Sequence, residues 1–349
     1  MRNHSILLMT IMILWAGTAA DAKYSGGTGE PNDPYKIATA EGLNDMGKYE
    51  EDWDKHFILV NDVNLARITG TQFKIIGRFV NWWDPNNKPF TGVFDGNKHK
   101  VWNFTWSSTG RNYIGLFGWV GSSGQIKNLG MENVNVNTVN GGCVGGLVGL
   151  NWGTITNCYS TGSVSGTISV GGLVGETNFE SMITNSYSAG SVTGNYNSVG
   201  GLVGGNEGTI TNCYSTGSVS GTYDAVGGLV GENYKGTITN CYATGNVSGK
   251  DYVGGLVGYN YKGMVNSSFW DTQTSGRTTS AGGIGKTTAE MKTISTFTNA
   301  GWDFVEIWGI GENQTYPFLR TEPAGDSNYD KKVDLIDLAI LASHWLEGN

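Results

Sequence analysis

An alternating run of oxygen-bearing side chains near the end of the chain has the spacing of a metal-binding loop. If Asp326 is the first position of a twelve-residue loop, side-chain oxygens fall at positions 1, 3, 5, 9 and 12, and position 7 offers its backbone carbonyl. The expected ligands are Asp326, Asn328, Asp330, Lys332 through its carbonyl, Asp334 and Asp337. Because calcium takes six to eight oxygen ligands in a flexible shell, this pattern predicts a calcium site.

A short amphipathic helix is expected directly after this loop. Apolar side chains recur every three or four residues and would form one face, at Leu335, Leu338, Leu341, Ala342 and Trp345. Loop and helix together, over residues 325–346, resemble one half of a dockerin, the calcium-dependent unit that docks to cohesin modules. The resemblance implies a cohesin-like partner protein. An acidic amphipathic helix that binds no metal is the alternative.

Two features depart from the dockerin pattern. Dockerins usually contain two such units, whereas one is found in this sequence. Loop position 6, normally a glycine in a left-handed conformation, is Lys331, which costs about 1 kcal/mol. Both departures weaken the expected affinity but leave the ligands in place.

The sequence offers few residues for catalysis. The histidines after the N-terminal segment, His56, His99 and His344, form no H-E-x-x-H motif, and no G-x-S-x-G motif is present. A polysaccharide lyase or glycoside hydrolase would have to draw on the N-terminal flank, around Asp95, His99 and Lys100. The chain is therefore not expected to be an enzyme, and a carbohydrate-active enzyme is the alternative.

Nucleotides and nucleic acids are not expected as ligands. The stretch Gly282–Thr288 resembles a phosphate-binding loop, but Ser280 stands where the first glycine is required, and no apolar strand precedes it. The net charge is −8 and Lys and Arg are not clustered, so the chain lacks the basic surface that nucleic acids need.

A repeat organises the middle of the chain. The string V-G-G-L-V-G occurs five times, and its leucines at 147, 173, 202, 229 and 256 define units of 26 to 29 residues. Short runs rich in β-branched residues alternate with Gly, Asn and Ser, which indicates strands and tight turns rather than helices. One unit cannot bury its apolar face alone, so the units must stack. Unequal spacing and short strands favour an all-β, right-handed parallel β-helix (a β-solenoid) over a propeller of antiparallel hairpins.

Three columns of equivalent residues follow from aligning the units. Stacked asparagines at a turn are expected to hydrogen-bond along the rod, at Asn128, Asn157, Asn185, Asn212, Asn240 and Asn266. The next column is small and buried, with Leu129, Cys158, Ser186, Cys213, Cys241 and Ser267, so buried thiols are favoured over disulfides. Cys143 has no partner in this column.

The third column is aromatic and is the candidate ligand surface of the rod. Its aromatic members are Trp152, Phe179, Tyr234 and Tyr261, with Glu207 between them. Aromatic rings on one edge could stack against the apolar faces of sugars. The alternative is that they pack on each other and shield the turn.

The repeat unit resembles the GLUG repeat, named for its G-L-x-G core and found in bacterial surface and secreted proteins, some of them immunoglobulin A peptidases. The resemblance covers residues 113 to 276. It implies an extracellular, non-catalytic adhesive or spacer module.

The flanks of the repeat are expected to cap it. Before it, residues 23–112 contain a predicted helix from about Thr39 to Lys48 and strands at Phe57–Val60 and Phe73–Ile76. Residues 277–324 form the C-terminal cap and linker, with a short helix near Thr288–Ile294 and aromatics over the last coil.

Residues 1–22 read as an export signal, with an apolar run of about ten residues before Ala20-Asp21-Ala22. This run is too short for a membrane-spanning helix, and no later one is expected. A retained membrane anchor is the alternative. The domains expected are thus 1–22, 23–112, 113–276, 277–324 and the calcium segment 325–349. Together they predict a secreted or cell-surface adhesion or scaffold protein, tethered through its calcium segment, whose rod contacts polysaccharide or matrix.

Overall fold

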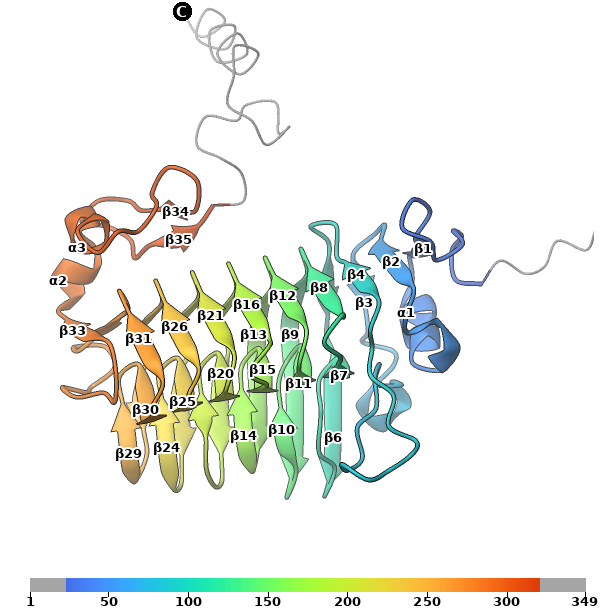
Figure 1. Cartoon of the computed structure of the whole chain (residues 1–349), viewed down its shortest axis with the longest axis horizontal. Helices are drawn as coiled ribbons and strands as arrows, with labels where there is room; N and C mark the ends of the chain where they lie inside the picture. Colours follow the sequence, from blue (N-terminus) through green and yellow to red (C-terminus); the bar gives the residue numbers. More distant parts are fainter. Residues whose placement is uncertain (1–22, 321–349) are drawn as a thin grey trace, which may run out of the picture.

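The computed structural model describes residues 23–320, which form a parallel β-solenoid of about six turns (Figure 1). Four parallel sheets run along the rod, and each of the five coils that carry the V-G-G-L-V-G string contributes to all of them. The predicted parallel solenoid is therefore confirmed. The expected export signal (1–22) and calcium segment (325–349) lie outside the described residues.

Each coil passes through the sheets in a fixed order. Sheet 1 contains β10 (Gly142–Val144), β14 (Ile168–Gly171), β19 (Val199–Gly200), β24 (Asp224–Gly227) and β29 (Asp251–Gly254). Sheet 2 follows with β7 (Phe117–Val120), β11 (Val148–Asn151), β15 (Val174–Thr177), β20 (Val203–Asn206), β25 (Val230–Tyr234) and β30 (Val257–Tyr261).

Sheet 3 begins in the N-terminal flank. It contains β1 (Tyr35–Ile37), β2 (His56–Leu59), β4 (Val93–Asp95), β8 (Gln125–Lys127), β12 (Thr154–Thr156), β16 (Met182–Thr184), β21 (Thr209–Thr211), β26 (Thr237–Thr239) and β31 (Met264–Asn266). Sheet 4 contains β3 (Val63–Asn64), β5 (Lys100–Trp102), β6 (Thr105–Thr109), β9 (Gly130–Val139), β13 (Tyr159–Gly166), β17 (Tyr187–Ser188), β18 (Ser191–Gly194), β22 (Tyr214–Ser215), β23 (Val219–Gly221), β27 (Tyr242–Ala243), β28 (Val247–Ser248), β32 (Phe269–Asp271) and β33 (Ile284–Lys286).

The repeated string builds the core and the close contact between coils. The five repeat leucines are fully buried, and strand partners lie one repeat apart, as in Val203 with Val230. Glycine is required because the backbones of neighbouring coils approach closely: a Cβ on Gly172 would lie 2.4 Å from the carbonyl oxygen of Gly201 in the next coil. The string V-G-G-L-V-G is thus a packing motif.

The predicted asparagine ladder forms at the corner between sheets 3 and 4. From Asn128 to Asn240, the five asparagines have φ between 49° and 53°, a left-handed conformation that asparagine tolerates. Asn157 donates to Asn128 at 3.1 Å, and Asn240 donates to Asn212 at 3.3 Å. These bonds show that this column is structural.

The predicted register of the last coil is wrong by one residue. Asn266 pairs with Thr239, not with Asn240, because Val265 takes the inward position beside Ile238. Ser267 consequently falls outside the thiol column, where Ser268 accepts a hydrogen bond from the backbone of Cys241 at 3.0 Å.

All four cysteines are free thiols. Cys158, Cys213 and Cys241 are buried, and burial raises the pKa of Cys158 to about 12. Cys143 lies in sheet 1, away from this column.

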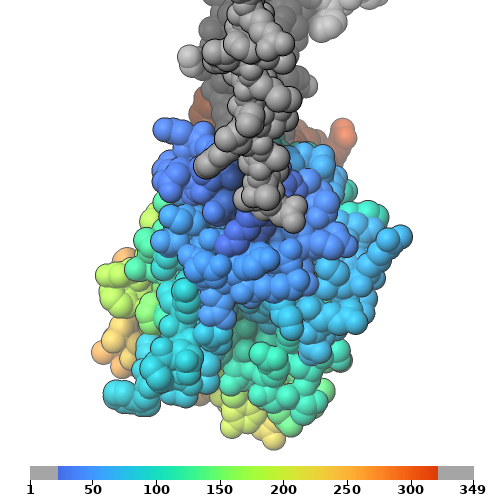
Figure 2. Space-filling view, turned by 90° about the vertical axis from the view of Figure 1, so that its right-hand side faces the viewer, coloured from blue at the N-terminus to red at the C-terminus, as the bar shows by residue number. Residues whose placement is uncertain are grey.

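The N-terminal flank closes one end of the rod (Figure 2). Helix α1 (Ala40–Met46) begins at Thr39, whose hydroxyl accepts from the backbone N–H of Gly42 at 3.1 Å. Two short 3-10 helices follow at Glu50–Asp52 and Gly70–Gln72. The predicted strand Phe73–Ile76 is wrong: Ile76 makes only an isolated bridge. The N–H of Lys74 instead donates to the Asn44 side chain of α1, at 2.7 Å.

The C-terminal flank lies against the last coils. It contains α2 (Thr288–Met291), α3 (Ile294–Thr298), β34 (Trp308–Gly309) and β35 (Phe318–Leu319). Phe297, Trp302 and Trp308 form one buried cluster with Tyr242 and Phe269 of sheet 4. In the phosphate-loop look-alike, Gly282 approaches Val265 and Gly283 approaches Leu256, so this segment crosses the end of the core. Within residues 23–320, no helix is long and apolar enough to span a membrane.

Candidate ligand-binding pocket

An open pocket of about 330 Å³ lies where sheets 1 and 2 meet in the middle of the rod. We call it the glutamate pocket. It is lined by Ile168, Ser169, Glu176, Asn197, Ser198, Gly205, Asn206, Glu207, Glu232 and Tyr234. Because these residues come from three successive coils, repeat stacking alone positions them.

The floor of the pocket is a column on sheet 2. Glu176 pairs with Gly205, which pairs with Glu232, so the two glutamates stand two coils apart, about 9.6 Å along the rod. A Cβ on Gly205 would meet only Glu176 Cγ at 3.5 Å and Ser169 Oγ at 3.7 Å. The missing side chain of Gly205 therefore opens the space between the glutamates.

Hydrogen bonds from Cys143 of sheet 1, and from Ser198 just before β19, hold the two outer carboxylates. The thiol of Cys143 donates to Glu176 Oε2 at 3.1 Å, and the hydroxyl of Ser198 donates to Glu232 Oε2 at 2.9 Å. Both donors have left-handed backbone, with φ of 54° and 62°.

Glu207 is the third carboxylate of the pocket. Burial raises its pKa, and the charges of Glu176 and Glu232 raise it further, while Lys235 opposes them. The described residues that line the pocket include no Lys or Arg. The pocket thus combines three carboxylates with hydroxyls, amides and one tyrosine ring.

The predicted aromatic column is only partly assembled. Tyr234 and Tyr261 are strand partners, and their rings stack at 5.1 Å and 12°. Lys235 and Lys262 lie over the two rings, at 4.8 and 5.1 Å. Tyr234 also borders the glutamate pocket.

Phe179 does not belong to this column, and its predicted place there is wrong. Thr177 pairs with Asn151, so Asn178 is the equivalent of Trp152. Consistent with this, the N–H of Asn178 donates to the carbonyl of Asn151, at 3.0 Å. This repeat is the longest, at 29 residues, and the extra residues place Phe179 in a turn with 68% of its surface exposed.

Trp152 joins a second aromatic group instead. Its ring stacks on Trp82 at 5.6 Å and meets Trp119 edge-on at 5.1 Å. Trp82 and Trp83 are 69% and 92% exposed. Their loop is held by Asn87, whose side chain accepts from the N–H of Val80 at 2.8 Å. Sequence reasoning missed these tryptophans, although the dipeptide stands out in the polar stretch 81–87.

A tyrosine ladder on sheet 4 was also missed. The rings of Tyr159, Tyr187, Tyr214 and Tyr242 stack at 4.7 to 5.0 Å with angles of 3 to 6°. Its signal was the tyrosine that follows Cys or Ser in each repeat. Since each ring covers its neighbour and Tyr242 is buried in the C-terminal cluster, the ladder offers few free ring faces.

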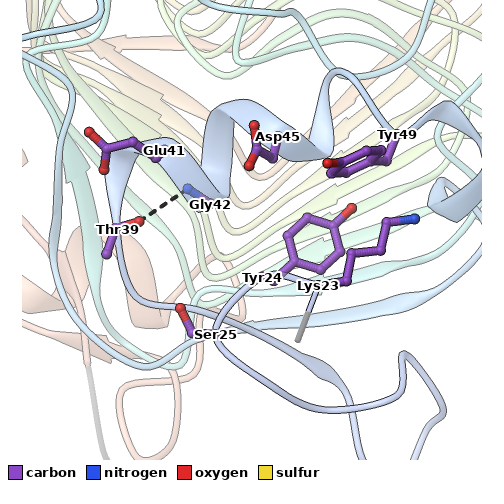
Figure 3. Close-up of a pocket in the computed structure, with 8 residues that line it drawn as sticks. All are labelled: Lys23, Tyr24, Ser25, Thr39, Glu41, Gly42, Asp45 and Tyr49. Atoms are coloured by element: carbon purple, nitrogen blue, oxygen red, sulfur yellow. Dashed lines mark hydrogen bonds between the residues drawn. The ribbon is translucent and has the colours of Figure 1, made fainter. Parts of the chain in front are cut away.

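A second cavity, of about 540 Å³, lies between α1 and residues 23–25 (Figure 3). Glu41 and Asp45 face it from α1. Lys23 pairs with Asp52 at 2.7 Å, and Tyr24 donates to the same carboxylate at 2.9 Å. These contacts fasten the start of the described chain to the cap.

The residues considered for catalysis in the N-terminal flank are not brought together as one site. Asp95 pairs with Lys127, His99 with Asp62, and Lys100 with Glu132, at 3.3, 3.0 and 2.8 Å. These pairs link neighbouring coils at the surface.

The expected calcium ligands, Asp326 to Asp337, lie outside the described residues. Between residues 23 and 320, no group of three or more His, Cys, Asp and Glu side chains is arranged to hold a metal ion.

Comparisons with known proteins agree with the repeat and the fold. Residues 140–165, 195–220 and 222–248 match the GLUG motif, so the predicted GLUG repeats are confirmed. The chain is 31% identical over 172 residues to halomucin of Haloquadratum walsbyi, covering 48% of this chain and 2% of halomucin. It is 34% identical over 146 residues to a provisionally named Gly-rich membrane protein of Evansella cellulosilytica, covering 40% of this chain and 16% of that protein. The chain therefore spans a small part of both relatives.

A crystal structure supports the fold alone. It is that of a candidate immunoglobulin A1 protease from Bacteroides ovatus, with a TM-score of 0.61 at 24% sequence identity. The match covers 85% of this chain and 95% of that one.

Proposed function

We propose that this protein is an extracellular, non-catalytic adhesion or scaffold protein that binds polysaccharide through the glutamate pocket and is tethered by a calcium-dependent C-terminal segment. Two observations support the location and the absence of catalysis. Its relatives carry the names of a mucin-like protein and a membrane protein. The His99, Lys100 and Asp95 side chains are engaged in separate ion pairs.

The observation that carries the proposal is an open pocket on a rigid stack of coils. Its wall offers carboxylates, hydroxyls and amides, and the ring of Tyr234 borders it. Sugars are recognised by the same combination, since their hydroxyls need hydrogen-bond partners and their ring faces need an aromatic surface. The exposed pair Trp82 and Trp83 offers a second surface of this kind on the same rod.

A polysaccharide array tests the pocket. The full chain is expected to bind a subset of glycans, and Gly205→Trp is expected to abolish binding because it fills the space between Glu176 and Glu232. Ser220→Trp, at an exposed position of sheet 4, is the matched control and should leave binding unchanged. If Gly205→Trp binds as the unmodified chain does, the pocket is not the site.

The calcium segment is tested separately. We propose that Asp326, Asn328, Asp330, Lys332, Asp334 and Asp337 hold calcium and that the segment docks to a cohesin-like module, as the dockerin resemblance implies. The full chain should capture such a module in calcium and lose it in chelator. Asp326→Asn combined with Asp330→Asn should abolish capture, whereas the exposed control Asp251→Asn should not. Capture that ignores calcium would contradict the docking proposal.

A carbohydrate-active enzyme is the second candidate. Glu176 and Glu232 line one pocket, and their backbones are two coils, about 9.6 Å, apart along the rod. Inverting glycosidases also place two carboxyl groups on either side of one bound sugar chain, ~6.5–9.5 Å apart. Glu207 between them has a raised pKa, as a general acid requires. Release of reducing ends from polysaccharide, abolished by Glu207→Gln but not by the exposed Glu180→Gln, would establish hydrolysis and refute the non-catalytic proposal.

A further inference from the structure

The charge of the glutamate pocket restricts which glycan fits it. Three carboxylates converge on a space of about 330 Å³, and none of its lining residues is a Lys or Arg. Lys235 lies over the ring of Tyr234, on the pocket's border. A uronic acid polymer would bring further negative charge into this space, where like charges repel at close range. A ligand with positive charge is complementary to it.

Each of the two outer carboxylates, Glu176 and Glu232, has an oxygen that can accept a hydrogen bond from such a ligand. Cys143 and Ser198 each donate to Oε2 of their glutamate, at 3.1 and 2.9 Å. In the described part of the chain, Oε1 of Glu176 and of Glu232 has no hydrogen-bond partner. A carboxylate accepts several hydrogen bonds, and one from an ammonium group is among the stronger kinds.

The backbone spacing of the two outer glutamates along the rod is close to the repeat of an extended sugar chain. Glu176 and Glu232 are about 9.6 Å apart along the rod. Successive rings of a β-1,4-linked glycan advance by about one coil and alternate in orientation, so every second amino group faces the same side. Gly205 leaves the floor flat between the two glutamates, and Tyr234 borders the space with an aromatic ring.

We propose that the glutamate pocket binds a glycan of glucosamine units, with ammonium groups at Glu176 and Glu232 and the sugar chain over Gly205 between them. This inference deepens the proposed function, because it assumes that the pocket is the polysaccharide site. A basic peptide shares the charge, but side chains on one face of an extended peptide recur about every 6.7 Å, which does not match the spacing of the two glutamates, so a glycan is favoured over it.

Calorimetric titration of the full chain tests the inference. At pH 5.5, where the glucosamine amines are protonated, glucosamine hexasaccharide should bind at least about tenfold more tightly than its fully N-acetylated form, because acetylation removes the charge. Galacturonic acid hexasaccharide should not bind. Affinity for the glucosamine chain should fall as salt increases.

Variants locate the binding. Glu176→Gln and Glu232→Gln keep the side-chain shape, and each should weaken glucosamine binding by about tenfold. Glu180→Gln, exposed on the same coil as Glu176, should have no effect. Circular dichroism of each variant verifies that the solenoid is intact.

The outcomes separate this inference from the proposed function. If the acetylated or another neutral glycan binds best, is blocked by Gly205→Trp and ignores both glutamine variants, the amine assignment is wrong and the polysaccharide pocket stands. If hexalysine binds as tightly as the glucosamine chain, the pocket recognises charge alone and the inference is overturned. If no glycan binds, both proposals fail.

Discussion

Two buried serines one coil apart allow a direct test of how buried hydroxyls contribute to this solenoid. Ser188 and Ser215 are strand partners on sheet 4, and Ala243 takes the equivalent position in the next coil. Both serine hydroxyls are buried without a hydrogen-bond partner. Ser186, in contrast, donates to the carbonyl of Thr184 at 2.8 Å and accepts from the N–H of Cys158 at 3.0 Å.

The two kinds of serine should respond oppositely to alanine. A buried polar group without a partner costs about 1–3 kcal/mol of unfolding free energy. Removal of the unpaired hydroxyl should therefore stabilise the folded protein, although a small part of this gain is lost because the hydroxyl no longer packs against its neighbours. We expect Ser188→Ala and Ser215→Ala to raise the unfolding free energy by up to about 1 kcal/mol each. Ser186→Ala should lower it by about 1–3 kcal/mol, because it leaves the N–H of Cys158 unpaired.

Urea unfolding, followed by tryptophan fluorescence and circular dichroism together, measures these differences. Agreement of the two signals is the control for cooperative unfolding, since stacked repeats can unfold in stages. The reasoning is refuted if Ser215→Ala destabilises the protein as strongly as Ser186→Ala does.

Three further predictions concern titration and the C-terminal flank. The raised pKa of Glu207 means that folding penalises its ionised form, so the penalty is absent below the unfolded-state pKa and fully present above the folded-state pKa. Glu207→Gln should therefore stabilise the protein at pH 7 and leave its stability unchanged at pH 3 in urea titrations. Because burial raises the pKa of Cys158 to about 12, a thiol reagent at pH 8 should label it only as fast as the rod opens, measured by mass spectrometry against urea-unfolded protein. The buried carboxylate of Asp271 accepts from Tyr316 at 2.7 Å and from the N–H of Gln273 at 2.8 Å, so Asp271→Asn should increase hydrogen exchange across residues 288–320 but not in sheet 2.

Much of the rod could be predicted from its sequence, because each coil has the same strands, corners and core positions. The V-G-G-L-V-G string indicates both a buried side chain, which requires leucine, and a close backbone contact, which requires glycine. The asparagine column was predictable for the same reason, since a left-handed corner recurs in every coil.

Register was less predictable wherever a unit departs from the repeat. Alignment from the repeat motif assigned Phe179 and Asn266 to columns that the structure fills with the neighbouring residue. The sequence spacing does not show at which residue the strand ends and the turn begins. The glutamate pocket was harder still. It draws on three coils, and its central feature is the absence of a side chain at Gly205.

The stacking of equivalent strands also defines the unit by which such a protein can change over evolutionary time. Duplicating or deleting one whole coil keeps every corner in phase and alters only the length of the rod. The same event has a sharp effect at one place, because the pocket is shared by three consecutive coils. A coil gained between Glu176 and Glu232 would move the two glutamates apart by about 4.8 Å. A coil gained before Cys143 would leave the pocket whole and carry it farther from the N-terminal cap. Rod length can thus vary freely, whereas the pocket is inherited as a block of neighbouring coils.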